Sequence, residues 1–350
     1  MALDYTRLHC LKAWKLKRTA FLMGLPSTGT KHELSTIVHE KLSAPLPFNG
    51  GRIVSVDMGI RNLALCVLDV PPLNIEQRPI SRPAVLHWLK KDLLASTAST
   101  NDDRGKENPH SSAEVTKDQT REYAITPENL PKNAFTPSEL AKTAYAMTMQ
   151  LLSYDPDIIL IERQRFRSGG SAAILEWTVR VNMLESMLWA CLQTMRESKI
   201  IQESNELLAV HEVSPQRVAN FWTTGPEISL RPADNLFTHS LDEQEASLSP
   251  SPDPKAKKAV RKAEKIAIAR SWLDGSDLVD APLTFRGEAA KTAAAFEMRR
   301  RKGIRVATDH AAEEPIGKLD DLADCLLQAV AWVRWEENRR DIGRLLSKSD

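Results

Sequence analysis

The sequence lacks the marks of several protein classes. Its 350 residues include only four cysteines, and these are scattered: Cys10, Cys66, Cys191 and Cys325. No CxxC pair or cysteine–histidine pattern indicates zinc, and a disulfide framework is not expected, which indicates a reducing compartment. No apolar run approaches the roughly 18 residues needed to span a membrane, and no secretory signal is visible. The formal net charge is only +1, so the overall charge balance does not by itself indicate a nucleic-acid-binding protein.

The local charge is far less even than the total. Hydrophobic residues make up 42% and charged residues 27% of the chain, which is typical of a globular protein with a real core. Residues 1–31 carry six basic side chains against one acid, and residues 255–270 carry seven against one. Such clusters are typical of phosphate-facing surfaces, although a charged run is often only a solvated face.

The N-terminal segment has the pattern of a small helical module. Residues 8–43 predict two short helices around the turn-forming stretch "GLPSTGT". Thr30 is expected to cap the second helix, with Glu33 at the capping-box position. The stretch "SAPLPFNGG" follows, with two prolines and two glycines. We therefore expect a module at 1–43 and a linker at 44–51.

The remainder, residues 52–345, predicts one α/β or α+β domain with a mixed sheet. Three early strands are followed by alternating helices and strands. Polar stretches near 95–135 and 226–254 are interpreted as insertions. Strands are expected at 52–58, 62–70, within 83–94, at 157–162 and at 207–213. Helices are expected at 136–154, 172–196, from Ser214, at 255–273 and from about Lys318.

The stretch "IVSVDMGIRNLALCVLD" places one carboxylate, Asp57, within an apolar, β-branched strand. Gly59 follows, and a second apolar strand begins at once. Burying a carboxylate is costly unless a metal ion, a hydrogen-bond donor or a cation compensates for it. The simpler alternative is that Asp57 caps the turn at Gly59.

Two further acidic positions stand beside apolar runs. The buried run "DIILIE" ends in Glu162, and its simpler interpretation is an ion pair with Arg163 or Arg165. In the helix "KLDDLADCLLQAVAW", the spacing of 100° per residue places Asp320 and Asp324 about 40° apart, at one edge of the apolar stripe. Asp321 lies about 60° beyond Asp324. The alternative for this cluster is a favourable interaction with the helix dipole.

Together these acids predict an oxygen-rich pocket beside the sheet. Hard cations such as Mg²⁺ prefer such ligands, and two ions roughly 4 Å apart stabilise the attacking and leaving oxygens of a phosphodiester displacement. The basic loop "RQRFRSGGS" directly follows Glu162, which favours a phosphate substrate over three unrelated structural roles.

Four segments resemble the RNase H-like nuclease superfamily and, within it, the fungal mitochondrial Holliday junction resolvases. They are "SVDMGIRNLALCVLD", "IERQRFRSGGS", "SPQRVANFW" and "KLDDLADCLLQAVAW". The segment "AFLMGLPSTGTKHELSTIVHEKL" resembles a SAP motif, a small helical DNA-binding module. This explains the basic N-terminus better than a mitochondrial presequence does. The resemblance implies an RNase H-like mixed sheet flanked by helices, preceded by the SAP-like module.

The resemblance also implies a homodimer that binds four-way DNA junctions and makes symmetric nicks in the mitochondrial matrix. It implies Mg²⁺ or Mn²⁺, with two ions per active site, and neither a membrane nor a small-molecule cofactor. The products are a 5′-phosphate and a 3′-hydroxyl that can be religated. The implied metal ligands are Asp57, Glu162, Asp320 and Asp324, and Asp321 is included in the catalytic set.

The DNA contacts are our inference from the basic segments. Phe166 is expected to stack on or wedge against a base, with packing beneath its loop as the alternative. Lys262 or Lys265 is expected to approach the scissile phosphate, with a solvated face as the alternative. The full expected set is Lys31, Arg163, Arg165, Phe166, Arg167, Ser168, Lys258, Lys262 and Lys265. The long helix containing Met183 and Met187 is expected to supply core and dimer interface.

Two rival functions are considered. One is a non-catalytic, RNA-binding splicing factor of the same fold that acts on group I introns. That role predicts loss of the acidic set, whereas all the acids are present. The other is a nuclease for RNA–DNA hybrids, against which the SAP-like segment and "IERQRFRS" argue.

Overall fold

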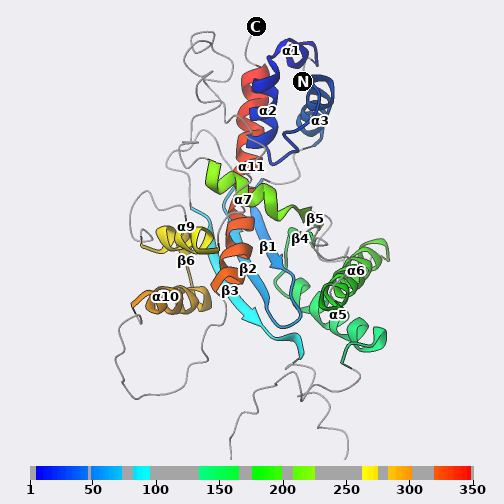
Figure 1. Ribbon diagram of the computed structural model, residues 1–350, viewed down its shortest axis with the longest axis vertical. Helices are drawn as coiled ribbons and strands as arrows, with labels where there is room; N and C mark the ends of the chain where they lie inside the picture. Colours follow the sequence, from blue (N-terminus) through cyan, green and yellow to red (C-terminus); the bar gives the residue numbers. More distant parts are fainter. Residues whose placement is uncertain are drawn as a thin grey trace, which may run out of the picture.

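The described part of the chain is built around one six-stranded mixed sheet with the strand order β5-β4-β1-β2-β3-β6 (Figure 1). The computed structural model describes residues 5–45, 49–72, 82–94, 134–164, 176–198, 208–224, 262–274, 283–301 and 319–347. The strands are β1 (Gly51–Asp57), β2 (Leu63–Val70), β3 (Ala84–Lys91), β4 (Ile158–Glu162), β5 (Ala209–Val213) and β6 (Thr284–Phe285). The predicted mixed sheet is therefore confirmed.

The pairing of the strands explains how the acids come together. β1 and β2 form an antiparallel hairpin in which Asp57 lies opposite Ala64. β4 runs parallel to β1, and β5 runs parallel to β4. Parallel strands end at the same edge of a sheet. The last residues of β1 and β4 therefore meet at one edge.

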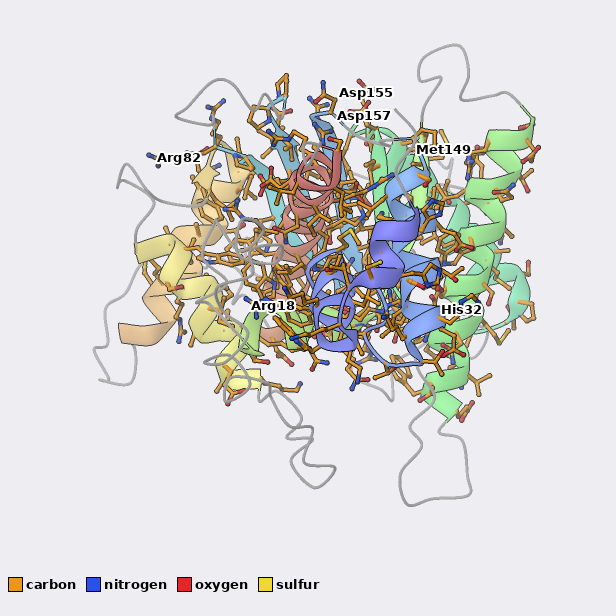
Figure 2. All side chains as sticks on the ribbon, turned by 90° about the horizontal axis from the view of Figure 1, so that it is seen from above. Arg18, His32, Arg82, Met149, Asp155 and Asp157 are labelled. Carbon is orange, nitrogen blue, oxygen red and sulfur yellow. The ribbon has the colours of Figure 1, made fainter. Side chains whose placement is uncertain are left out.

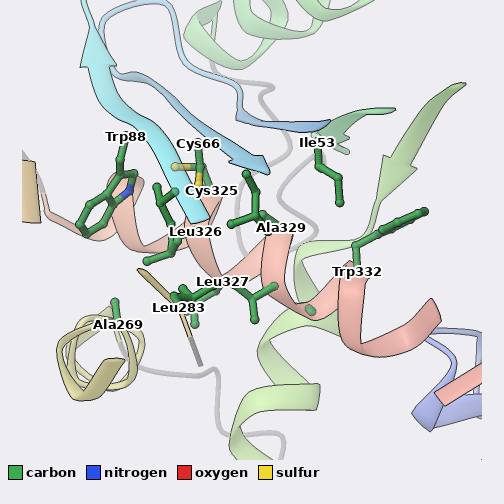
Figure 3. Packing of buried hydrophobic residues seen from close by; sticks show 14 of the residues in the cluster. Ile53, Cys66, Trp88, Ala269, Leu283, Cys325, Leu326, Leu327, Ala329 and Trp332 are labelled. Carbon is green, nitrogen blue, oxygen red and sulfur yellow. The ribbon is translucent and has the colours of Figure 1, made fainter. Parts of the chain in front are cut away.

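Helices cover both faces of the sheet. The helices of this domain are α5 (Pro137–Leu152), α6 (Glu176–Glu197), α7 (Pro215–Thr224), α9 (Lys262–Asp274), α10 (Glu288–Arg301) and α11 (Leu319–Ser347). Because side chains alternate across a strand, Val54 and Val56 of β1 pack towards α5 and α6. Ile53 packs in the second core with α11. Within that core, Figure 3 shows Cys66 of β2 beside Cys325 of α11.

Helix α11 is more buried than its sequence pattern predicts. The periodicity indicates a single apolar stripe, yet α11 is buried on every side from Cys325 to Val333. The reason is that the sheet covers one side of the helix while α7 and α9 cover the other. Polar residues such as Gln328 are consequently enclosed in the middle of the domain.

Within residues 5–45, the N-terminal segment forms three helices rather than the two expected: α1 (Tyr5–Cys10), α2 (Ala13–Leu22) and α3 (Lys31–Ser43). The predicted first helix is interrupted near Leu11. The capping box of α3 is confirmed, since the Thr30 amide donates to Glu33 Oε2 (2.7 Å) and the Glu33 amide donates to Thr30 Oγ1 (3.3 Å). Figure 2 looks onto this module from above, with Arg18 and His32 labelled on it.

The module packs against the C-terminal half of α11. Asn338 Nδ2 donates to the Leu22 carbonyl (2.8 Å), and the buried Glu336 accepts a bond from Lys41 Nζ (2.6 Å). Gly24 has φ +67°, and a Cβ there would lie 2.3 Å from the Trp335 ring. Glycine is therefore required at position 24 for two reasons: its left-handed conformation and the close approach of the Trp335 ring.

Several expectations differ from the described structure or lie outside it. The strand β6 and the helix α10 have no counterpart in the sequence prediction. Residues 95–133 and 226–254 of the expected insertions lie outside the described residues, as do the first residues of the helices expected from 172 and from 255. Within the described part of the chain, no helix has the length and apolar character needed to cross a bilayer.

Candidate metal centre

Three carboxylates meet at the edge of the sheet. Asp57, Glu162 and Asp324 each offer an oxygen, and these oxygens all lie within 4.8 Å of one another. Val56 of β1 pairs with Ile161 of β4, so the next residue of each strand is an acid on the same face. Asp324 reaches them from the first turns of α11. The structure thus brings together three of the four predicted metal ligands.

A buried polar network fixes α11 above the strand ends. Ser55 Oγ donates to the Cys325 carbonyl (2.8 Å), and Gln328 Nε2 donates to Ser55 Oγ (3.1 Å). Gln328 also bonds the carbonyls of Val56 and Leu160, each at 3.3 Å. These bonds lie one residue from Asp57 and two from Glu162. They therefore hold the strands and the helix in the arrangement that gathers the carboxylates.

Gln328 was not among the residues predicted from the sequence. The signal was present in "CLLQAVAW", where one polar residue interrupts an apolar helix. A buried amide needs hydrogen-bond partners, but only the folded sheet shows which carbonyls supply them.

The electrostatics of the cluster favour a bound cation. Burial, followed by the charges of Glu162, Asp324 and Asp321, raises the pKa of Asp57 well above its usual value, and Lys265 opposes this shift. Burial also raises the pKa of Asp324, and Lys265 again opposes the shift. A hard divalent cation prefers this type of oxygen donor. It would also offset the repulsion between the acids, so the donor set fits Mg²⁺ or Mn²⁺.

Each aspartate of the predicted cluster on α11 is paired with a lysine. Asp320 pairs with Lys262. Asp321 Oδ2 lies 3.1 Å from Lys90 Nζ, and Asp324 Oδ1 lies 2.7 Å from Lys265 Nζ. Lys90 was not predicted, because its contact depends on how β3 lies against α11.

Among the described residues, the group whose oxygens lie within 4.8 Å of one another includes neither Asp320 nor Asp321. The charge of Asp321 contributes to the raised pKa of Asp57, and the charges of both Asp320 and Asp321 contribute to the raised pKa of Asp324. Asp320 and Asp321 are therefore both candidates for the fourth carboxylate.

A small open pocket beside α7 and α9 is lined by two of the carboxylates, Glu162 and Asp324. Glu162, Asp324, Lys265 and Gln328 supply polar lining, and Trp222 lies among its apolar walls. A polar substrate group can therefore reach the acids from this side.

The expected DNA-contact residues are only partly described. Arg163 is about half exposed, with Nη1 3.5 Å from Glu212 Oε1. Lys31 is exposed at the first position of α3, and Lys262 and Lys265 lie beside the acids. Five predicted residues lie outside the described residues: Arg165, Phe166, Arg167, Ser168 and Lys258.

Comparison with known proteins gives consistent matches over nearly the whole chain. The family described as "Mitochondrial resolvase Ydc2 / RNA splicing MRS1" matches residues 53–342. The protein "Cruciform cutting endonuclease 1, mitochondrial" of Schizosaccharomyces pombe is 25% identical over 321 residues, which cover 92% of this chain and 91% of the relative. The protein of the same description from Saccharomyces cerevisiae is 23% identical, over 96% of this chain and 85% of its own length.

A solved structure supports the fold. The crystal structure of the yeast mitochondrial Holliday junction resolvase Ydc2 aligns with a TM-score of 0.53 and 23% identity, covering 96% of this chain and 98% of the other. The predicted RNase H-like architecture, a mixed sheet flanked by helices, is therefore confirmed.

Proposed function

Because the chain belongs to the family of the mitochondrial resolvase Ydc2 and the RNA-splicing protein MRS1, we propose that it is an endonuclease that resolves four-way DNA junctions. The observation that carries this choice is the convergence of Asp57, Glu162 and Asp324 within 4.8 Å. A splicing role requires RNA binding but no cluster of mutually repelling carboxylates. Such a cluster destabilises the folded protein unless a cation binds to it when the protein functions. The cluster therefore favours nuclease chemistry.

The proposed metal ligands are Asp57, Glu162 and Asp324, with Asp321 as the fourth carboxylate. We propose Mg²⁺ or Mn²⁺, with two ions per active site. When bound, such ions lower the pKa of water and stabilise negative charge on phosphate oxygens during an in-line displacement. Asp320, paired with the exposed Lys262, is the alternative for this fourth position.

The chain's own residues position the substrate. Lys265 is hydrogen-bonded to Asp324 and lines the pocket, so its ammonium group is available to a phosphate that enters there. Arg163 follows Glu162 directly in the chain. It would contact the DNA backbone on the other side of the Glu162 carboxylate. Ser55 and Gln328 hold the strand ends and α11 in place, which keeps the ligand geometry rigid as substrate binds.

The N-terminal module is proposed to add DNA affinity through its basic surface, with Lys31 as a contact. The module is packed on α11, the helix that carries Asp324, so this contact would have a fixed position relative to the active site.

A second copy of the chain would place two active sites about one two-fold axis. That symmetry matches a junction that needs two equivalent nicks, and a homodimer is therefore proposed.

Both curated relatives are named mitochondrial, which supports a mitochondrial and specifically a matrix location.

The proposal is tested by comparing three labelled substrates with Mg²⁺: a four-way junction, a linear duplex of the same sequence, and a group I intron RNA. We expect the junction alone to be nicked, at symmetric positions, leaving ends that DNA ligase can rejoin. Tight binding of the intron RNA together with an uncut junction would contradict the proposal and favour a splicing function.

A further inference from the structure

Two lysines hold the aspartates that the proposed metal set needs. Lys90 Nζ lies 3.1 Å from Asp321 Oδ2, and the two side chains are 14% and 20% exposed. Lys265 Nζ lies 2.7 Å from Asp324 Oδ1, and both of these side chains are 21% exposed. The third pair is different, because the Lys262 side chain is 74% exposed and therefore largely screened by solvent. Lys90 and Lys265 are thus part of the site, whereas Lys262 is at its surface.

The sheet register explains how Lys90 reaches the site. Asp57 of β1 lies opposite Ala64 of β2, and Ala64 lies opposite Lys90 of β3. Directly opposed residues point to the same face of a sheet. Lys90 therefore shares the face of Asp57 and α11, two strands away at about 9–10 Å. Lys91 points to the opposite face, where its Nζ donates to Gln150 Oε1 (3.0 Å).

The balance of charge bears on how many metal ions the site can hold. The four carboxylates Asp57, Glu162, Asp321 and Asp324 outnumber the two ammonium groups by two, the charge of a single divalent ion. If both ammonium groups leave, the four carboxylates match two such ions. A DNA phosphate is a suitable new partner for a lysine ammonium group, because it is itself a singly charged oxygen anion.

We propose that Lys90 and Lys265 are placeholder cations that hold Asp321 and Asp324 in the free protein and move to DNA phosphates when the junction binds, so that the second divalent ion enters only with the substrate. This inference rests on the proposed junction endonuclease. It assigns Lys90 a role in the site as a positioning residue for Asp321. It also makes metal and DNA binding mutually reinforcing, because coupling between two ligands is reciprocal.

The test is a Mn²⁺ titration of the full chain, followed by electron paramagnetic resonance of the free ion. It is run without DNA and with a junction whose phosphorothioate linkages at the crossover slow hydrolysis. We expect about one ion per chain without DNA and two with the junction, and tighter binding of the second ion by about tenfold or more. The reciprocal effect is tighter junction binding with Mn²⁺ than with EDTA, measured by fluorescence anisotropy.

Three variants assign the effect to Lys90. Lys90→Gln keeps a polar side chain, somewhat shorter than that of lysine, but loses the charge. This variant should bind the second ion without DNA, which reduces the coupling. Lys90→Arg keeps the charge and should behave as the wild type. Lys91→Gln is the matched control on the opposite face and should also leave the titration unchanged.

Results that would contradict the placeholder role differ from those that would contradict the proposed function. Two ions bound to the free wild type as tightly as to the complex, or weaker Mn²⁺ binding by Lys90→Gln, would overturn the placeholder role. Absence of any Mn²⁺ binding in either state would instead contradict the metal centre of the proposed function. The readouts are metal and DNA affinities, so they remain informative whatever the cutting rate of each variant.

Discussion

Gln328 Nε2 on α11 donates a hydrogen bond to the carbonyl of Val56, the residue immediately before Asp57. Gln328 is almost completely buried, and its amide also bonds Ser55 and Leu160. One side chain thus connects the helix of Asp324 to both strands that end in the other two carboxylates. The geometry of the site depends on this connection as much as on the acids themselves.

The first prediction concerns that connection. Gln328→Met preserves the approximate volume but leaves buried oxygen atoms without their donor, and we expect a loss of about 1–3 kcal/mol in the free energy of unfolding. The rate of junction cutting should fall because α11 can shift over the strand ends, while junction binding persists. Urea unfolding and single-turnover cutting measure the two effects. Gln193→Met, on the exposed face of α6, is the control and should change neither.

The second prediction concerns pH and metal. The pKa of Asp57 is raised in the folded protein, so the folded state binds its proton more tightly than the unfolded state does. Without metal, the free energy of unfolding should therefore fall as the pH rises above the ordinary aspartate value towards the raised one. Asp57→Asn should flatten this decrease and stabilise the metal-free protein at neutral pH.

Added Mg²⁺ should reverse the order of stability, so that the wild type becomes more stable than Asp57→Asn. Binding to the folded state raises the melting temperature of the wild type, since a ligand of the folded state stabilises it by mass action. Asp57→Asn should gain much less. Thermal melts in EDTA and in Mg²⁺, from about pH 4 to about pH 8, provide the measurement. An equal gain in both proteins would remove Asp57 from the ligand set.

The third prediction concerns the N-terminal module. If Lys31 contacts a phosphate, Lys31→Gln should weaken junction binding and reduce the slope of log affinity against log salt by about 0.9. Lys142→Gln removes an exposed lysine of α5 that pairs with Glu139, and should leave the slope unchanged. A slope unaffected by Lys31→Gln would show that this lysine faces solvent in the complex.

The fourth prediction concerns the packing of the module on α11. Gly24→Ala would place a Cβ against the Trp335 ring and would force an alanine into a left-handed conformation. We expect a loss of about 1–3 kcal/mol in the free energy of unfolding. Gly287→Ala isolates the conformational part, because Gly287 also has positive φ but has no atom within 4 Å of the added Cβ. Gly287→Ala should therefore lower the free energy of unfolding by less than Gly24→Ala does. An equal loss would indicate that the module shifts to relieve the contact with Trp335.

The sequence was most informative where an acid interrupts an apolar pattern. Asp57 and Glu162 stand out because each ends an apolar strand, and the parallel pairing of β1 and β4 brings them to one edge. Asp324 was found because it borders the apolar stripe of its helix. In each case the local pattern and the fold agree.

The missed features depend on contacts between distant segments. Lys90 acquires its partner through the register of three strands and the placement of α11 over them. Gln328 acquires its partners only when β1 and β4 lie side by side. β6 has two residues, too few to show any alternation, so its pairing with Ala84 and Val85 could not be read from the pattern.

The proposed function depends on whether the carboxylate cluster cuts junction DNA. The most direct measurement is single-turnover cleavage of a labelled four-way junction in Mg²⁺ by the wild type and by Asp57→Asn, with junction affinity measured in EDTA for both. We expect symmetric nicks by the wild type and a rate lower by about a hundredfold or more for Asp57→Asn, with junction affinity retained. Normal cutting by Asp57→Asn, or firm junction binding by a wild type that never nicks, would contradict it.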